Sequence, residues 1–147
     1  MIKKVSLAIG LMACLILSAC SFETSKSFTF SVETGDNIKV ELRTSDGYDM
    51  DSNVPFTVTK DGEDVARGTF LYGSSYEEYR TAYESTEDAT LLDEGEKDGN
   101  SYYAYSLPEE IDYFVYVADS DTAVVIASIN GDEAAADVFN ALTFTCE

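Results

Sequence analysis

Histidine is absent from the 147-residue sequence, and so is tryptophan. Histidine is the usual general base beside a serine or cysteine nucleophile, and it is the commonest neutral metal ligand. The serines do not form a Gly-x-Ser-x-Gly turn, and no glycine-rich phosphate loop occurs. We therefore expect no catalytic residue and no cofactor.

Basic residues are scarce, since nine Lys and Arg stand against 28 Asp and Glu, a formal net charge of −19. Such a surface repels nucleic-acid phosphates and anionic lipid headgroups, so no nucleic-acid partner is expected. With so many acids, carboxylate pairs arise by chance. We interpret Glu109-Glu110 and the pair Asp119 and Asp121 as solvated loop and turn residues. A carboxylate-dependent hydrolase, which needs only two acids, is the least favoured alternative.

The first twenty residues have the order of a secretory signal: Lys3-Lys4, an apolar run, and then Leu17-Ser18-Ala19-Cys20. The 16 residues from Val5 to Cys20 are fewer than the roughly 20 that a membrane-spanning helix needs. The Leu-Ser-Ala-Cys ending resembles the lipobox of bacterial lipoproteins. In that family the cysteine thiol receives a diacylglycerol and the chain is cut just before it.

This resemblance implies a signal peptide at 1–19, acylation of Cys20, a tether at 20–27 and a single domain at 28–147. Removal of 19 of the 147 residues takes away Lys3 and Lys4 but no acid, which leaves 128 residues and a net charge of −21. The expected location is extracytoplasmic, with the membrane reached only through the acyl chains on Cys20. An uncleaved signal anchor, or a chance cysteine after an ordinary signal, is the alternative.

Only three cysteines occur, and this assignment uses two of them: Cys14 leaves with the signal and Cys20 is acylated. Cys146 then has no partner within the chain. Because Leu142, Phe144 and Cys146 alternate at period two, we expect Cys146 to be a small buried residue of a final strand. If Cys20 were not acylated, a Cys20–Cys146 disulfide would become an alternative.

Alternating apolar and polar residues predict strands through most of the domain. Asp61-Gly62 and Asp98-Gly99 are typical of two-residue hairpin turns. The turn at 119–121 joins two strands that are apolar on both faces, which is typical of the centre of a covered sheet. The expected strands are 28–32, 38–42, 56–60, 63–70, 90–94, 101–107, 112–118, 122–129 and a closing strand to residue 146.

Two helices are expected, each beginning with a capping box: Ser75 with Glu78, and Asn130 with Glu133. The fold class is therefore α+β, mainly an antiparallel sheet of about 7–9 strands with two helices packed on it. This order of elements over residues 28–146 resembles the PsbP-like αβα sandwich, which also occurs in small bacterial lipoproteins, although this chain lacks tryptophan. The resemblance implies a non-enzymatic accessory or binding domain.

Two sets of residues are candidate binding sites. Asp49, Asp51 and Asn53 alternate as the first ligands of a calcium loop do, but the later positions of an EF-hand are missing. The other interpretation is an acidic loop whose side chains form Asx turns before Pro55.

Tyrosine is unusually frequent, with ten residues in the chain. Its flat apolar ring and polar tip suit recognition of a protein, peptide or glycan. The alternative is that the tyrosines pack the first helix onto the sheet. The candidate ligand face consists of Tyr76, Tyr79, Tyr83, Tyr103 and Tyr105.

The expected function is a lipid-anchored binding or accessory domain of unidentified ligand. The second alternative is a structural lipoprotein that docks a partner and has no small-molecule pocket.

Overall fold

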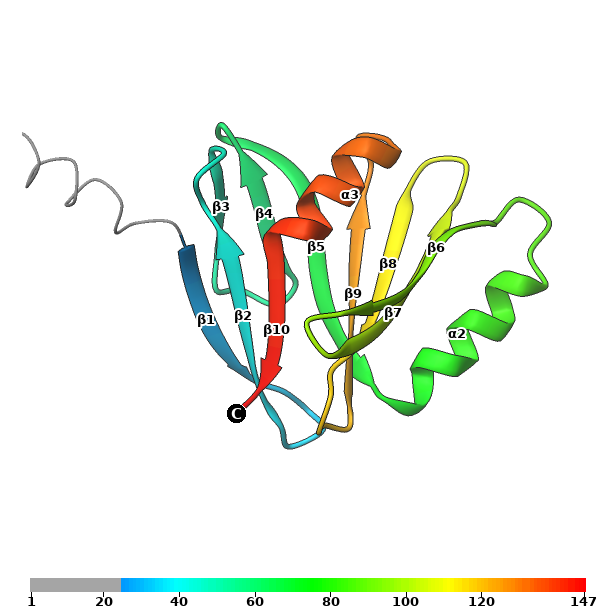
Figure 1. Ribbon diagram of the computed structural model, residues 1–147, viewed down its shortest axis with the longest axis horizontal. Coiled ribbons are helices and arrows are strands. Elements are labelled where there is room, and N and C mark those ends of the chain that lie inside the picture. Colours follow the sequence, from blue (N-terminus) through cyan, green and yellow to red (C-terminus); the bar gives the residue numbers. More distant parts are fainter. Residues whose placement is uncertain (1–24) are drawn as a thin grey trace, which may run out of the picture.

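The computed structural model describes residues 25–147, so the signal segment and Cys20 lie outside the described residues. Ten strands and two helices follow one another along this part of the chain (Figure 1). Their order is β1 (Ser25–Ser31), β2 (Asn37–Arg43), β3 (Tyr48–Met50), β4 (Phe56–Lys60), β5 (Glu63–Tyr72), α2 (Ser74–Glu84), β6 (Thr90–Lys97), β7 (Asn100–Ser106), β8 (Ile111–Tyr116), β9 (Thr122–Ser128), α3 (Asp132–Ala141) and β10 (Leu142–Cys146).

The strands form two antiparallel sheets. One has three strands in the order β1-β2-β10, and the other has seven in the order β3-β4-β5-β9-β8-β7-β6. In Figure 1 the three-stranded sheet occupies the left of the molecule and α2 the right. The predicted fold class is confirmed: an α+β domain that is mainly antiparallel sheet, with two helices.

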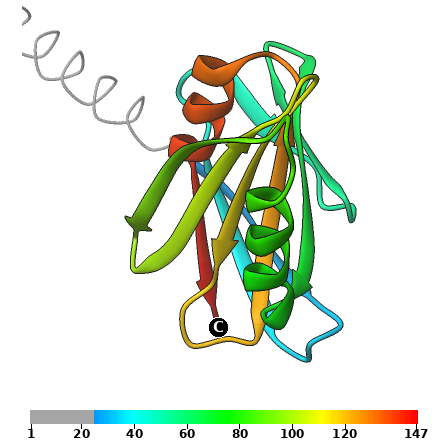
Figure 2. The ribbon, with the colours of Figure 1, turned by 90° about the vertical axis from the view of Figure 1, so that its right-hand side faces the viewer.

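The helices lie on opposite faces of the seven-stranded sheet. On one face, Phe139 of α3 stacks on Tyr113 of β8 with ring centroids 4.4 Å apart. On the other, Tyr79 of α2 contacts Phe114, the next residue of β8, at 5.3 Å. Successive side chains of a strand point to opposite faces, so these contacts place the helices. In Figure 2, which is turned by 90°, α2 lies in the foreground.

The main core lies between the large sheet, α3 and the three-stranded sheet. Inward-facing Ile38, Val40 and Leu42 of β2 are fully buried there, as is Leu142 of β10. The prediction for the central strands is confirmed, because β8 and β9 occupy interior positions of the large sheet and are buried on both faces.

Both Asp-Gly turns are confirmed as hairpins. The φ angles are 52° at Asp61 and 87° at Gly62, and 54° at Asp98 and 84° at Gly99. Two successive positive φ values give a turn whose twist matches that of the flanking strands, which is why Asp-Gly occurs there.

Neither predicted capping box forms. The residue before α2 is Gly73 and the residue before α3 is Gly131, and no side chain caps either helix. The tertiary structure sets the entry to α2, since the Gly73 N–H donates to the Asp121 carbonyl at 2.6 Å. At α3 the turn from β9 needs a φ of 94°, which glycine supplies at Gly131.

The start of β1 and the presence of β3 also differ from expectation. Strand β1 begins at Ser25 and not at Phe28, because Ser25 to Ser27 pair with Glu41 to Arg43 of β2. The predicted tether therefore gives three of its residues to the folded domain. The three-residue β3 was not predicted, because its alternation is too short to separate from the acidic loop around it.

Candidate functional site

A groove of about 580 Å³ opens to solvent where β1 meets β3, β4 and β5, and we call it the β3 groove. Its walls combine hydroxyls and carboxylates with two apolar side chains. It is lined by Lys26, Phe28, Asp49, Met50, Asp51, Ser52, Thr57, Thr59 and Asp64.

The groove lies beside an edge of each sheet. Strand β3 is the edge of the large sheet, and alternation buries Tyr48 and Met50 while turning Asp49 to the solvent. Strand β1 is the edge of the small sheet and contributes Lys26 and Phe28. The groove therefore depends on how the two sheets pack together, which no local pattern of the sequence encodes.

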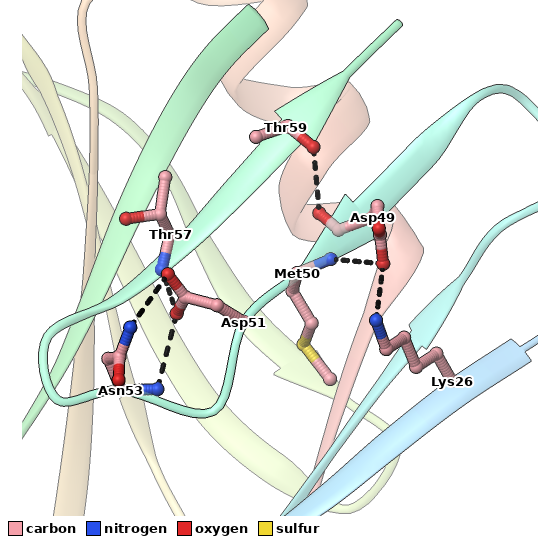
Figure 3. Close-up of polar contacts among 7 residues, drawn as sticks. All are labelled: Lys26, Asp49, Met50, Asp51, Asn53, Thr57 and Thr59. Carbon is pink, nitrogen blue, oxygen red and sulfur yellow. Dashed lines mark hydrogen bonds and ion pairs between the residues drawn. The ribbon is translucent and has the colours of Figure 1, made fainter. Parts of the chain in front are cut away.

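One ion pair crosses the groove between these edges (Figure 3). The Lys26 ammonium donates to Asp49 Oδ1 at 2.7 Å, and the Met50 N–H donates to the same oxygen at 2.9 Å. These bonds, Lys26 first, hold the pKa of Asp49 below its usual value. Both side chains are well exposed, so the pair contributes at most about 1 kcal/mol of stability. Its main effect is to fix the position of Asp49.

Asp51 organises the loop that follows β3. Its Oδ1 accepts the Thr57 N–H at 3.0 Å and the Asn53 N–H at 3.3 Å, and its Oδ2 accepts the Asn53 side-chain amide at 3.3 Å (Figure 3). The bond from Asp51 to the N–H two residues later is an Asx turn. The predicted Asx-turn arrangement is thus confirmed for Asp51.

Two of the three candidate calcium ligands, Asp49 and Asp51, accept hydrogen bonds from protein donors, and the third, Asn53, donates to Asp51. A cation at Asp49 would have to compete with the Lys26 ammonium, and the Asn53 amide is turned toward Asp51. Within residues 25–147 no group of three or more acidic or cysteine side chains has an arrangement that would hold a metal ion. The geometry therefore does not favour a metal site at Asp49, Asp51 and Asn53.

The five candidate tyrosines do come together, but between α2 and the sheet. Tyr103 is 0% exposed, Tyr105 3% and Tyr76 6%, Tyr83 is half-buried, and only Tyr79 is exposed, at 42%. Their rings pack against one another and against Phe114 at centroid distances of 4.8 to 6.4 Å, in stacked, tilted and edge-on arrangements. The packing interpretation is confirmed for this cluster, and a ligand could reach the three buried rings only if α2 left the sheet.

The carboxylate pairs singled out from the sequence are solvated. Glu109, Glu110, Asp119 and Asp121 are all exposed. The unusual carboxyl group is instead Asp112, which is 4% exposed on β8. Burial, opposed by a hydrogen bond from Tyr83, raises its pKa to about 6. The alternation of β8 could have indicated this burial. Asp112 lies on the same face of the strand as Phe114 and Tyr116, and that face packs against α2.

Cys146 lies in β10 as predicted, but it is half-buried, so the expected burial is only partial. It packs against the edge of the main core. Burial raises the pKa of its thiol, which disfavours the reactive thiolate.

No protein-family model matches this chain, and comparison with curated proteins and with solved structures finds no match either. Among residues 25–147, no helix is both long enough and apolar enough to cross a membrane.

Proposed function

We propose that this protein is an extracytoplasmic lipoprotein, anchored by acyl chains on Cys20, whose domain binds a ligand or partner without catalysing a reaction. The observation that carries the proposal is the series Lys3-Lys4, apolar run and Leu17-Ser18-Ala19-Cys20. Two or three acyl chains suffice for stable anchoring, since each buried CH₂ adds about 0.8 kcal/mol of membrane affinity.

The position of β1 supports this proposal. Ser25, the first residue of β1, follows Cys20 by five residues, and five residues span at most about 18 Å. Lys26 and Phe28, which follow directly in β1, line the β3 groove. An anchor on Cys20 would therefore hold this groove close to the membrane surface and to molecules exposed there.

The chemistry of the groove suits a polar ligand. Asp49, Asp51 and Asp64 outnumber Lys26, and the hydroxyls lie beside the apolar Phe28 and Met50. Such a lining favours an uncharged or cationic peptide, protein segment or glycan over an anionic one. We propose the β3 groove as the binding surface.

A carboxylate-dependent hydrolase is less well supported. It needs an acid with a raised pKa and a second carboxylate roughly 5 to 10 Å away across a cleft. In the groove the pKa of Asp49 is lowered, and Asp51 accepts three hydrogen bonds within its own loop. The carboxyl group whose pKa rises, Asp112, is buried beneath α2.

Mass spectrometry of the protein from its native membrane tests the anchor. We expect the mature chain to begin at Cys20 with added acyl mass, and a Cys20→Ser variant to lose the acyl mass and leave the membrane fraction. A native protein that keeps Met1 and carries no acyl group would contradict the proposal.

Capture of partners from the native envelope tests the groove. We expect Ser52→Arg, which fills the groove with a bulky side chain, to lose a partner that the unmodified protein retains. Thr145→Arg is the matched control, because it adds the same charge on exposed β10 surface outside the groove. If the Ser52→Arg variant retains every partner, the groove is not the binding surface, and the partner-docking alternative gains support.

A further inference from the structure

Asp112 is the one buried carboxyl group among the described residues. The other buried polar side chains, Asn100, Thr122 and Ser128, all form hydrogen bonds. Asp112 is satisfied only in part, because its Oδ2 accepts the Tyr83 hydroxyl at 2.7 Å while its Oδ1 has no partner. A buried acceptor without a donor is costly, so this arrangement requires an explanation.

The surroundings of Asp112 contain no compensating cation. Helix α2 contributes Tyr83, whose ring stacks on Tyr105 of β7 with centroids 5.0 Å apart. Tyr105 is in turn the residue that pairs with Asp112 between β7 and β8. Strand β9 places uncharged Ala127 opposite. The charges of Arg80 and Glu84 of α2 affect the pKa of Tyr105. None of the lysines or arginines of residues 25–147 forms an ion pair with Asp112.

The charge of Glu110, in the loop just before β8, adds to burial in raising the pKa of Asp112. Two ionised carboxylates offer acceptors only and repel each other. One proton added to Asp112 changes this, because it removes the repulsion and turns one carboxylate oxygen of Asp112 into a donor.

We propose that Asp112 holds a proton while α2 is packed on the large sheet, and that this proton latches the helix there. When the proton is on Oδ1, Oδ2 still accepts the hydrogen bond from Tyr83, and Oδ1 becomes a hydrogen-bond donor. Loss of the proton leaves a buried negative charge under α2, beside a second one in the loop. The latch does not depend on the lipid anchor.

The expected pH dependence runs opposite to ordinary acid denaturation. Since the pKa of Asp112 is about 6 in the folded chain and its usual value is 3.8, the folded state binds a proton that an opened state releases. The contribution of the latch is complete below about pH 4 and is lost as the pH rises through 6. A difference of about two pKa units corresponds to about a hundredfold change in the opening equilibrium of α2.

Opening would uncover the tyrosine cluster, because Tyr76 of α2 and Tyr103 and Tyr105 of β7 are buried where the helix meets the sheet. The proton would thus control access to an aromatic surface that is closed in the structure.

Hydrogen exchange of the α2 amides in the full chain, corrected for intrinsic rates, tests the latch. Between pH 4.5 and pH 8 we expect protection to fall by up to about thirtyfold, because part of the contribution is already lost at pH 4.5. Asp112→Asn should abolish this pH dependence and keep the protection of the α2 amides high at every pH, because its side chain is uncharged and its carbonyl oxygen still accepts from Tyr83. Glu109→Gln, a neighbouring exposed residue, is the control that should retain the dependence.

An unchanged pH dependence in Asp112→Asn, or none in the unmodified chain, would overturn the proposal. Carbon NMR titration of the Asp112 carboxyl in the unmodified chain keeps the question decidable if the variant does not fold. A midpoint near pH 6 supports the latch, and a midpoint at or below pH 4 refutes it.

Discussion

At the scale of single residues, a few side chains fix how closely the layers approach. Gly68 of β5 lies opposite Phe56 of β4, and a Cβ on Gly68 would overlap the Phe56 ring. Phe56 is fully buried and packs against Phe30 of the other sheet at 5.7 Å. The missing side chain of Gly68 therefore makes room for a ring that joins the two sheets.

Gly68→Ala is expected to destabilise the domain by about 1–3 kcal/mol, because Phe56 must leave its position in the core. Gly95→Ala is the control, since a Cβ there meets only Tyr102 at an ordinary 3.6 Å. Urea unfolding of both variants measures the difference. Equal stabilities would show that the core adjusts around Phe56 at no cost.

Asn100 joins β7 to β10 and to the turn between β8 and β9, and it is 4% exposed. Its amide donates to the Phe144 carbonyl of β10 at 2.8 Å, and its carbonyl accepts the Ala118 N–H at 2.8 Å. Asn100→Ala leaves both backbone groups without a partner, so we expect a loss of about 2–4 kcal/mol. The exposed neighbour provides the comparison, because Ser101→Ala should change the unfolding midpoint little.

At the scale of elements, the turn between β1 and β2 is bonded to the turn between β8 and β9 at the lower end of Figure 1. Asp36 Oδ2 accepts from the Thr122 hydroxyl at 2.8 Å, the Asp121 N–H at 2.9 Å and the Thr34 hydroxyl at 3.1 Å. These bonds hold the pKa of Asp36 below its usual value. One carboxylate thus connects the two sheets through their turns.

Asp36→Ala is expected to lower the urea midpoint at pH 7. Because the folded pKa is below the usual value of 3.8, the contribution of Asp36 is present above that value and is lost as the pH falls through the folded pKa. The difference in urea midpoint between the Asp36→Ala variant and the unmodified chain should therefore disappear at acid pH. Asp121→Ala keeps the bonding N–H and should show no such difference.

The helix starts show why element boundaries were harder to predict than elements. Ser75-Glu78 and Asn130-Glu133 have the spacing of capping boxes, yet Gly73 and Gly131 precede the helices. A capping preference is worth about 1 kcal/mol, and strand pairing and turn geometry outweigh it here. The Asp-Gly hairpins were predictable because their positive φ values are a local property of those residues.

At the scale of the whole molecule, charge governs what the surface can approach. A net charge of −19 disfavours contact with anionic lipids, so we expect membrane association to depend on Cys20 alone. The Cys20→Ser chain should not sediment with anionic vesicles even at low salt, where attraction to basic patches would be strongest. Sedimentation of that variant with the vesicles would reveal a second membrane contact.

The candidate sites also differ in whether neighbouring residues or contacts between distant segments determine them. Asp51 formed its predicted Asx turn because the bond spans two residues. The tyrosine cluster assembled as strand and helix periodicity implied, but its burial depends on α2 closing over β7 and β8. The β3 groove and the burial of Asp112 arise from contacts between segments far apart in the sequence.

The sequence by itself determined the fold class, the turns and the faces of the strands, because side-chain period and turn chemistry act over a few residues. It also determined the absence of histidine chemistry and the strong negative charge. Only the tertiary structure decided which carboxyl group is buried, where a groove opens and which tyrosines are covered. Each of these depends on the packing of one sheet or helix against another, and solvent exclusion is a property of that packing.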